Sequence, residues 1–181
     1  QMRSQFFQNT GTVRFVELRA EECGARFERK YLGRGLARLD WNRDGRMDFV
    51  VSHIGDPASL VTNHTENAGC YLKIRLHATT TARDAIGAVV DVVTGRRTLS
   101  KQLVAGDGYM ASNERMLQFG LAASQTADRI EVRWPSGDVS TVVAAPANAT
   151  IVLIEGRRQC ILQREGLAEQ LDVVTSTASG P

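Results

Sequence analysis

The sequence predicts an all-β protein, and two observations lead to this fold class. Short apolar stretches of about five residues alternate with turns rich in Gly, Asn and Asp along most of the 181 residues. Only one segment, near residues 167–174, spaces its apolar side chains as a helix would, so no helices are available to connect the strands of a parallel α/β sheet. This pattern favours propeller blades or an antiparallel β-sandwich or barrel.

The composition narrows the class of protein. Hydrophobic residues make up 43% and charged residues 23% of the chain, as in an ordinary globular protein. The formal net charge is only +2 and the basic residues are scattered, so no nucleic-acid partner is expected. No apolar run is long enough for a transmembrane helix, so we expect no membrane span.

The three cysteines, Cys23, Cys70 and Cys160, lie far apart and form no Cys-x-x-Cys motif, which disfavours a zinc site. Their spacing fits one disulfide plus a free thiol and three free thiols equally well.

The strand signal is strongest after residue 70. Leu72, Ile74 and Leu76 alternate with Lys73 and Arg75, so we expect the apolar side chains on one face of a strand and the two basic ones on the other. Residues 88–93 and 98–104 are expected to form one hairpin, and residues 129–134 and 139–143 a second one.

We expect three regions. Residues 1–66 form a repeat region with short strands at 14–18, 35–39 and 49–53, and residues 67–158 form the sandwich or barrel. Residues 159–181 form a C-terminal tail, in which Leu167, Leu171 and Val174 favour a short helix and residues 175–181 a frayed end.

An acidic loop between two expected strands is the main candidate site. Asp40, Asn42, Asp44 and Asp48 stand at positions one, three, five and nine of this loop, with Gly45 at position six. Ca²⁺ takes six to eight oxygen ligands, and alternate positions of a tight loop can turn such oxygens toward one ion. The glycine permits the sharp reversal that the loop needs.

The predicted calcium ligands are the side chains of Asp40, Asn42, Asp44 and Asp48 and the backbone carbonyl of Arg46. An EF-hand is excluded because position twelve is Val51 and strands flank the loop. The alternative is a metal-free loop of Asx turns, and Mg²⁺ is disfavoured by its stricter octahedral geometry. Calcium is preferred because carboxylates crowded this closely repel one another unless a cation compensates.

Other polar residues give weaker signals. His53, His64 and His77 lie in no motif with a nucleophile, so ordinary strand or turn positions are expected for them. Asp84 and Asp107 resemble a glycosidase carboxylate pair only in residue type, and turn-capping roles are favoured.

Two sets of sequence blocks carry a resemblance to known families. The first set is Phe7-x-Asn9-x-Gly11-x-x-x-Phe15 and Gly33-Arg34-Gly35-Leu36-Ala37-x-x-Asp40-Trp41-Asn42-Arg43-Asp44-Gly45-x-x-Asp48-Phe49-Val50-Val51. The second set is Tyr71-Leu72-x-Ile74-x-Leu76, Arg83-Asp84-Ala85-Ile86-Gly87-Ala88, Gly106-x-Gly108-Tyr109, Phe119-Gly120-Leu121, Trp134-Pro135-Ser136-Gly137 and Glu155-Gly156. The first set resembles FG-GAP (VCBS) repeats, the blades of integrin-type β-propellers, and the second resembles the ASPIC/UnbV domain.

The resemblance implies a calcium-loaded partial propeller blade followed by an antiparallel ASPIC/UnbV sandwich or barrel. Because one blade cannot bury both faces of its sheet, further blades of a longer chain, or packing on the second region, are expected. The family includes extracellular proteins and UnbV-type proteins encoded with enediyne antibiotic biosynthesis.

Two functions follow from the resemblance. The first is a non-catalytic adhesion, ligand-binding or scaffolding module that is secreted or at the cell surface and binds a protein, a carbohydrate or a small molecule. The second is a cytoplasmic UnbV-type enzyme or accessory protein of natural-product biosynthesis. We favour the first, because a set of metal ligands is present beside no credible catalytic motif.

Overall fold

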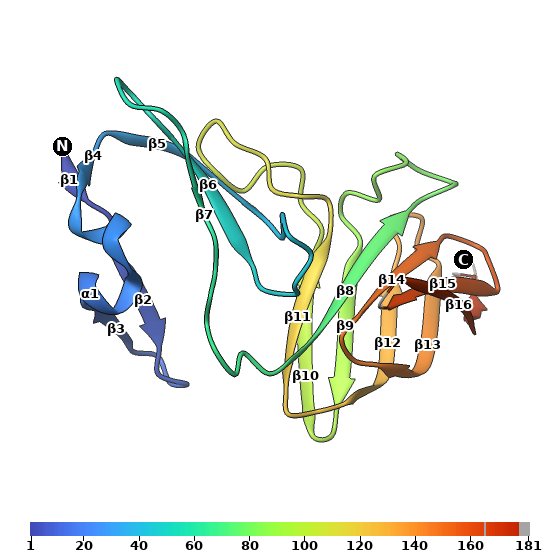
Figure 1. Ribbon diagram of the computed structural model, residues 1–181. Coiled ribbons are helices and arrows are strands. Elements are labelled where there is room, and N and C mark those ends of the chain that lie inside the picture. Colours follow the sequence, from blue (N-terminus) through green and yellow to red (C-terminus); the bar gives the residue numbers. More distant parts are fainter. Residues whose placement is uncertain (165, 178–181) are drawn as a thin grey trace.

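The computed structural model describes residues 1–164 and 166–177, and most of its regular structure is β-strand. Figure 1 shows a sandwich of two sheets made by the second part of the chain and a more open set of strands made by the first part. The predicted all-β fold class is confirmed, and the described strands do not close into a barrel. No helix in these residue ranges is long and apolar enough to cross a membrane.

One sheet of the sandwich has five strands in the order β10-β9-β12-β13-β17, and all its neighbouring pairs are antiparallel. Its strands are β9 (Val89–Thr94), β10 (Arg97–Gln102), β12 (Thr126–Arg133), β13 (Val139–Pro146) and β17 (Val174–Ser176). Gly95 and Gly137, with φ of +57° and +97°, lie in the turns between β9 and β10 and between β12 and β13. Both predicted hairpins are therefore confirmed.

The second sheet also has five strands, in the order β11-β8-β14-β15-β16. They are β8 (Cys70–His77), β11 (Leu117–Ala122), β14 (Ala149–Ile154), β15 (Gln159–Arg164) and β16 (Leu167–Asp172). The β8–β14 pair is parallel and the other pairs are antiparallel. The chain reaches β14 from two strands of the opposite sheet, so no hairpin sets an antiparallel direction at this pair.

The core lies between these two sheets. Leu72 and Ile74 of β8 and Ile130 and Val132 of β12 have no exposed surface. Successive strand residues point to opposite faces, so every second side chain enters the core, as the alternating sequence predicted. Burial of each such aliphatic side chain stabilises the fold by roughly 1.5–3 kcal/mol.

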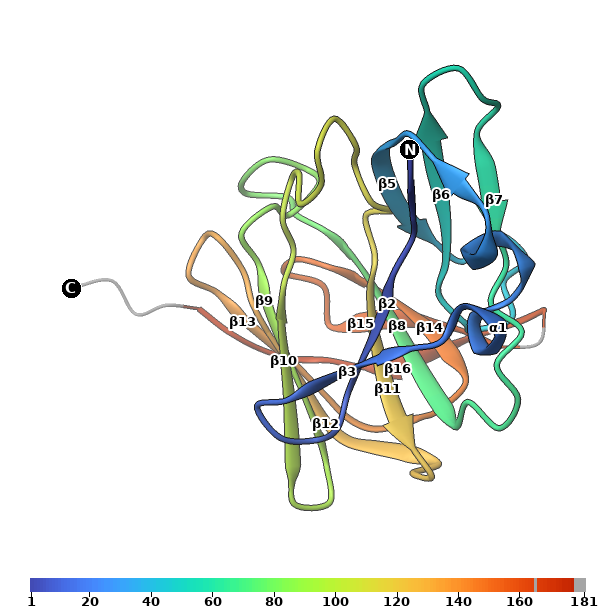
Figure 2. The ribbon, with the colours of Figure 1, turned by 90° about the vertical axis from the view of Figure 1, so that its left-hand side faces the viewer.

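The first part of the chain forms smaller sheets. A three-stranded antiparallel sheet has the order β5-β6-β7, and β2 and β3 form a separate hairpin. The elements are β1 (Met2–Arg3), β2 (Phe6–Asn9), β3 (Phe15–Leu18), α1 (Ala20–Cys23), the 3₁₀ turn η1 (Ala25–Glu28), β4 (Lys30–Tyr31), β5 (Gly33–Leu39), β6 (Asp48–His53) and β7 (Ser59–Val61). In Figure 1, β1 to β4 lie on the side of the β5-β6-β7 sheet that is turned away from the sandwich, and Figure 2 views the molecule from that side.

The C-terminal region differs from the sequence prediction. The helix predicted from Leu167, Leu171 and Val174 is wrong, because these residues lie in or beside strands β16 and β17. β15, β16 and β17 complete the two sheets, so the boundary expected at residue 158 falls inside the sandwich. β16 pairs with β15, and β17 pairs with β13. These backbone hydrogen bonds outweigh the local preference for a helix that the spacing of the apolar residues indicates. Residues 178–181 of the predicted frayed end lie outside the described residues.

Candidate metal-binding loop and its docking surface

The loop between β5 and β6 contains the predicted calcium ligands. Arg43 and Gly45, with φ of +61° and +83°, reverse the chain within a few residues. A Cβ atom at Gly45 would overlap the ring of Tyr71, so the loop also needs glycine at this position for space. These two left-handed residues bring the backbone of Asp44 within hydrogen-bond distance of the Asp40 side chain.

Asp40 and Asp48 are buried and act as acceptors for backbone groups of the loop. Asp40 Oδ1 accepts from the Asp44 N–H at 3.1 Å, and Asp40 Oδ2 accepts from the Gly45 N–H at 2.8 Å. Asp48 Oδ2 accepts from the Trp41 N–H at 3.2 Å, and its Oδ1 accepts from the Asn63 N–H at 2.7 Å. The two carboxylates therefore hold the loop in shape as well as being candidate ligands.

Asp44 is bound by its own neighbours. Its Oδ1 accepts from the Arg46 N–H at 2.8 Å, and its Oδ2 accepts from Asn42 Nδ2 at 2.7 Å and from Arg46 Nη2 at 2.6 Å. Burial by itself would raise the pKa of Asp44, but the hydrogen bonds from Arg46 and Asn42 and the charge of Arg46 lower it below its ordinary value. The guanidinium of Arg46 thus already supplies positive charge to the loop.

Lys73 supplies a second cation from a distant strand, and the local spacing of the loop does not predict it. Lys73 Nζ forms an ion pair with Asp40 Oδ2, and these side chains are 5% and 0% exposed. The alternation of β8 is as predicted, with Lys73 on the face opposite Leu72, Ile74 and Leu76. Lys73 does point away from the sandwich core, but the Asp40 loop covers that outer face of the sheet.

The loop contacts the outer face of the sandwich sheet at two further residues. Gln118 of β11 donates from Nε2 to the Gly45 carbonyl at 2.5 Å, and the ring of Tyr71 packs against Gly45. β8 and β11 are neighbours in the sheet, so Lys73, Tyr71 and Gln118 form one platform beneath the loop. We call these three residues the platform.

Strand β5 makes a second docking contact beside the platform. The Arg38 N–H donates to Asn113 Oδ1 at 2.7 Å, and the Glu114 N–H donates to the Arg38 carbonyl at 3.1 Å. The Arg38 guanidinium also pairs with Asp107 Oδ2 at 2.7 Å. Asp107 therefore bonds to β5 rather than lying beside Asp84, whose oxygen is 3.9 Å from Arg115 Nε.

The donor set fits a cation in part. Asp40, Asn42, Asp44 and Asp48 surround one reversal, but many of their oxygens already accept hydrogen bonds from the chain. Among the residues that the structure describes, no three or more His, Cys, Asp or Glu side chains form a group that could hold a metal ion. A site here therefore also needs Asn42 and the Arg46 carbonyl, and the ligand set stays a prediction.

Of the predicted strand or turn histidines, His53 lies in β6. Its ring stacks on Tyr31 with a centroid distance of 4.7 Å, and its Nε2 lies 2.9 Å from Ser59 Oγ. The ring thus joins β6 to β7 and β4, in agreement with the structural role that the sequence favoured.

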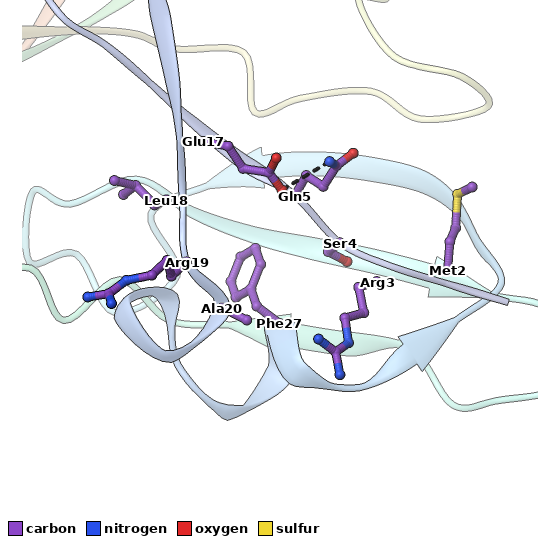
Figure 3. Close-up of a pocket in the computed structure, with 9 residues that line it drawn as sticks. All are labelled: Met2, Arg3, Ser4, Gln5, Glu17, Leu18, Arg19, Ala20 and Phe27. Atoms are coloured by element: carbon purple, nitrogen blue, oxygen red, sulfur yellow. Dashed lines mark hydrogen bonds between the residues drawn. The ribbon is translucent and has the colours of Figure 1, made fainter.

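A hollow lies in the first part of the chain, and none of the loop residues 40–48 lines it. It has a volume of about 580 Å³ and opens between the N-terminal strand and the segment around α1 (Figure 3). Its lining residues are Met2, Arg3, Ser4, Gln5, Glu17, Leu18, Arg19, Ala20 and Phe27. Gln5 Nε2 donates to Glu17 Oε1 at 3.0 Å across it, so its polar groups are partly paired.

Comparisons with known proteins find sequence relatives of the second part of the chain. Residues 78–159 match the sequence model of the family described as "ASPIC and UnbV". Cartilage acidic protein 1 of Xenopus tropicalis is 28% identical over 125 residues, which is 67% of this chain and 19% of that protein. The human protein is 26% identical over 137 residues, covering 72% and 20%, and the mouse protein is 29% identical over 118 residues, covering 62% and 18%.

The chain spans about a fifth of the length of these curated relatives. The match to the family begins just after β8 and ends at the start of β15, so it covers most of the sandwich. The FG-GAP resemblance of the first part stays a prediction. Residues 78–159 are therefore similar to the ASPIC and UnbV family, and about two thirds of the chain is similar to one part of cartilage acidic protein 1.

Proposed function

We propose that this chain is a non-catalytic binding or scaffolding module of a longer, extracellular protein. The main observation behind this proposal is that the Asp40 loop is docked on the sandwich through the buried Asp40–Lys73 pair. Groups that are buried and paired in this way fix the position of one unit on another and are not free to act on a substrate. The similarity to proteins named for cartilage supports an extracellular location.

The surface of the first part supports an origin in a longer chain. Only Phe27 and Val51 are buried among the large apolar side chains described before residue 67. The large side chains that stay exposed there include Phe6, Phe7, Phe15, Val16, Leu36 and Leu60. Apolar surface of this kind marks a contact site, and preceding propeller blades are the covering partner that we propose.

The docking of the β5-β6-β7 sheet on the sandwich can be tested by measuring whether the two parts unfold together. If the β5-β6-β7 sheet is a fixed part of the module, the chain should melt in one transition, and the loop at residues 40–48 should resist trypsin although it contains Arg43 and Arg46. Two separate calorimetric transitions, or early cleavage in this loop, would contradict a rigid scaffold.

We also propose that the loop binds one Ca²⁺ through Asp40, Asn42, Asp44, Asp48 and the Arg46 carbonyl. What favours it is the spacing of Asp40, Asn42, Asp44 and Asp48 around the reversal at Gly45, where Lys73 pairs with Asp40 and Arg46 with Asp44. A bound Ca²⁺ would supply the missing positive charge and would stabilise the folded state, since the unfolded chain offers no such site.

Calcium binding is tested by thermal denaturation in excess Ca²⁺ and in EDTA. Calcium should raise the melting temperature by several degrees, because ligand binding to the folded state alone shifts the unfolding equilibrium. Asp44→Ala should abolish this difference, whereas Asp56→Ala, which changes an exposed carboxylate outside the loop, should preserve it. Equal melting temperatures of the unaltered protein in both buffers would contradict the calcium proposal.

A further inference from the structure

The Lys73 ammonium is almost completely buried and makes few hydrogen bonds. The side chain of Lys73 is 5% exposed and that of its partner Asp40 is 0% exposed. Within the described part of the chain, the ammonium donates one hydrogen bond, which goes to Asp40 Oδ2. An ammonium carries three N–H donors, so the other two lack an acceptor in a place that solvent hardly reaches. The charged form of Lys73 is therefore poorly satisfied at this position.

An unused acceptor belongs to the residue beside Lys73. Gln118 stands directly opposite Lys73 in the β8–β11 ladder, so both side chains project from the same outer face of the sheet. Gln118 Nε2 donates to the Gly45 carbonyl, which sets the orientation of the amide group, and Gln118 Oε1 is buried and accepts no hydrogen bond. An amide nitrogen has a single N–H, so it matches one free acceptor better than an ammonium does.

The Asp40 carboxyl group is held in place by backbone donors on both of its oxygens. Oδ1 accepts from the Asp44 N–H at 3.1 Å, and Oδ2 accepts from the Gly45 N–H at 2.8 Å as well as from Lys73. Such donors stabilise the negative charge that develops when a nucleophile adds to a carboxyl carbon. Because Lys73 contacts this group directly, its nitrogen is held beside the carbon at a high effective concentration.

We infer that Lys73 and Asp40 join in an intramolecular amide bond, which makes the docking of the loop covalent. In this buried place of low dielectric, a proton passes from the ammonium to Asp40 Oδ2 and gives a neutral amine and a neutral carboxyl group. The Lys73 Nζ lone pair adds to Asp40 Cγ, and the Cγ–Oδ2 bond breaks. Oδ2 leaves as water, with that proton and a second one from the nitrogen. One ammonium and one carboxylate thus give one amide and one water, without any further reactant.

The amide bond deepens the proposed scaffolding role and rests on the docked position of the loop. It joins residues 33 positions apart, so it restricts the unfolded chain and keeps the β5-β6-β7 sheet attached to β8 when other contacts open. Its N–H has Gln118 Oε1 as a neighbouring acceptor. The bond and the proposed calcium site can be tested separately, because Asp40 keeps a carbonyl oxygen and carbonyl oxygens also bind Ca²⁺.

Mass spectrometry of the denatured protein tests the bond. The intact chain should be lighter than the mass of its sequence by one water molecule. Trypsin should release a branched peptide in which residues 39–43 are joined to residues 47–75, because an amide at Lys73 blocks cleavage after that residue. Fragmentation of this peptide should locate the link between Asp40 and Lys73.

Lys73→Arg separates the amide bond from the ion pair. A guanidinium keeps the positive charge opposite Asp40 but forms no amide, so this variant should have the full mass of its sequence and give no branched peptide. Lys101→Arg is the matched control, since Lys101 lies on β10 and donates to the backbone carbonyl of Gln118, and this variant should still lose water. If Lys73→Arg does not fold, the mass and the peptides of the unaltered protein decide the question.

Three results would overturn the inference. The full sequence mass in the unaltered protein would exclude the amide and leave a non-covalent docking, which the single melting transition tests by itself. Loss of water without a branched peptide would also exclude it, because an Asp-Gly step such as Asp44-Gly45 can lose water by closing on its own backbone. A branched peptide that persists in Lys73→Arg would show that the link involves another residue.

Discussion

Glu155 is the residue whose environment has the clearest electrostatic consequence. It follows β14 and is 2% exposed. Its Oε2 accepts from the backbone N–H groups of Thr79 and Thr80 at 2.7 and 2.9 Å, and its Oε1 accepts from Ser136 Oγ at 2.5 Å. Burial by itself would raise the pKa of Glu155, but these hydrogen bonds lower it to about 2. The Glu155 carboxylate thus connects the segment at Thr79 and Thr80 and the turn at Ser136 to the end of β14.

Glu155→Gln should lower the free energy of unfolding at pH 7 by roughly 2 kcal/mol, because hydrogen bonds to a charged acceptor are replaced by neutral ones. The pKa of Glu155 is lower in the folded state than its ordinary value of 4.5, so the charged group favours folding above pH 4.5. This stabilisation is lost as the pH falls from 4.5 to about 2. Urea denaturation at several pH values should show the difference between the two proteins shrink over that interval.

Glu169→Gln is the matched control, since Glu169 is exposed on β16. A stability difference between the unaltered protein and Glu155→Gln that persists unchanged at pH 2 would contradict the role of the charge.

Lys73 is the residue that shows why the sequence predicts the Asp40 loop only in part. The spacing of Asp40, Asn42, Asp44 and Asp48 is local, so the sequence indicates the acidic loop, whose role as a metal site stays a prediction. The cation that reaches Asp40 stands 33 positions away and comes from a strand whose alternation points it outward. Only the packing of one region on another decides that this lysine is buried.

The strands between residues 70 and 154 are predicted well by the alternation of apolar and polar residues and by the turn residues between them. The β9–β10 and β12–β13 hairpins have glycines with positive φ at their turns, and the apolar positions of β8 and β12 face the core. The helix predicted near residue 170 is wrong because this segment pairs with β15 at the edge of the sheet. Pairing of this kind depends on the presence of β15, and the spacing of three apolar residues does not reveal it. The short α1 and η1 segments have no pattern long enough to indicate them.

Gly69 directly precedes β8 and packs closely against the end of the neighbouring strand β11. It has φ of +75°, and a Cβ atom there would stand 2.7 Å from the carbonyl oxygen of Ala122. Gly69→Ala should therefore destabilise the protein by about 1–3 kcal/mol, because both the backbone conformation and the neighbouring strand oppose a side chain. Chemical denaturation measures the change.

Gly120→Ala is the control for this element, since nothing lies within 4 Å of the Cβ position at Gly120 in β11 and its φ is not positive. Equal effects of the two substitutions would show that the close approach to Ala122 is not what requires glycine at position 69.

The three cysteines report on the packing of the whole molecule. All three are free thiols, which settles the alternative that their spacing left open. Cys70 and Cys160 are buried in the sandwich core, and burial raises the pKa of the Cys160 thiol. Cys23, near the end of α1, is only half-buried, although burial raises the pKa of its thiol as well. Access of solvent therefore differs among the three thiols, and Cys23 is the most accessible.

A disulfide reagent that reports free thiols should react with Cys23 in the native protein and with all three cysteines in denaturant. Cys23→Ser should remove the native-state reaction and leave two thiols on unfolding. Rapid reaction of Cys70 or Cys160 in the native protein, identified by mass spectrometry of labelled peptides, would contradict a tightly packed sandwich.

The sequence by itself determined the all-β class, the faces of the main strands and the crowding of carboxylates at residues 40–48, because each depends on residues close together in the chain. The tertiary structure alone decided that β8 and β14 pair in parallel, that residues 159–176 complete the sheets and that Lys73 is buried against Asp40. These features depend on contacts between segments far apart in sequence, where the free energy of burial and pairing in the folded chain outweighs local preference.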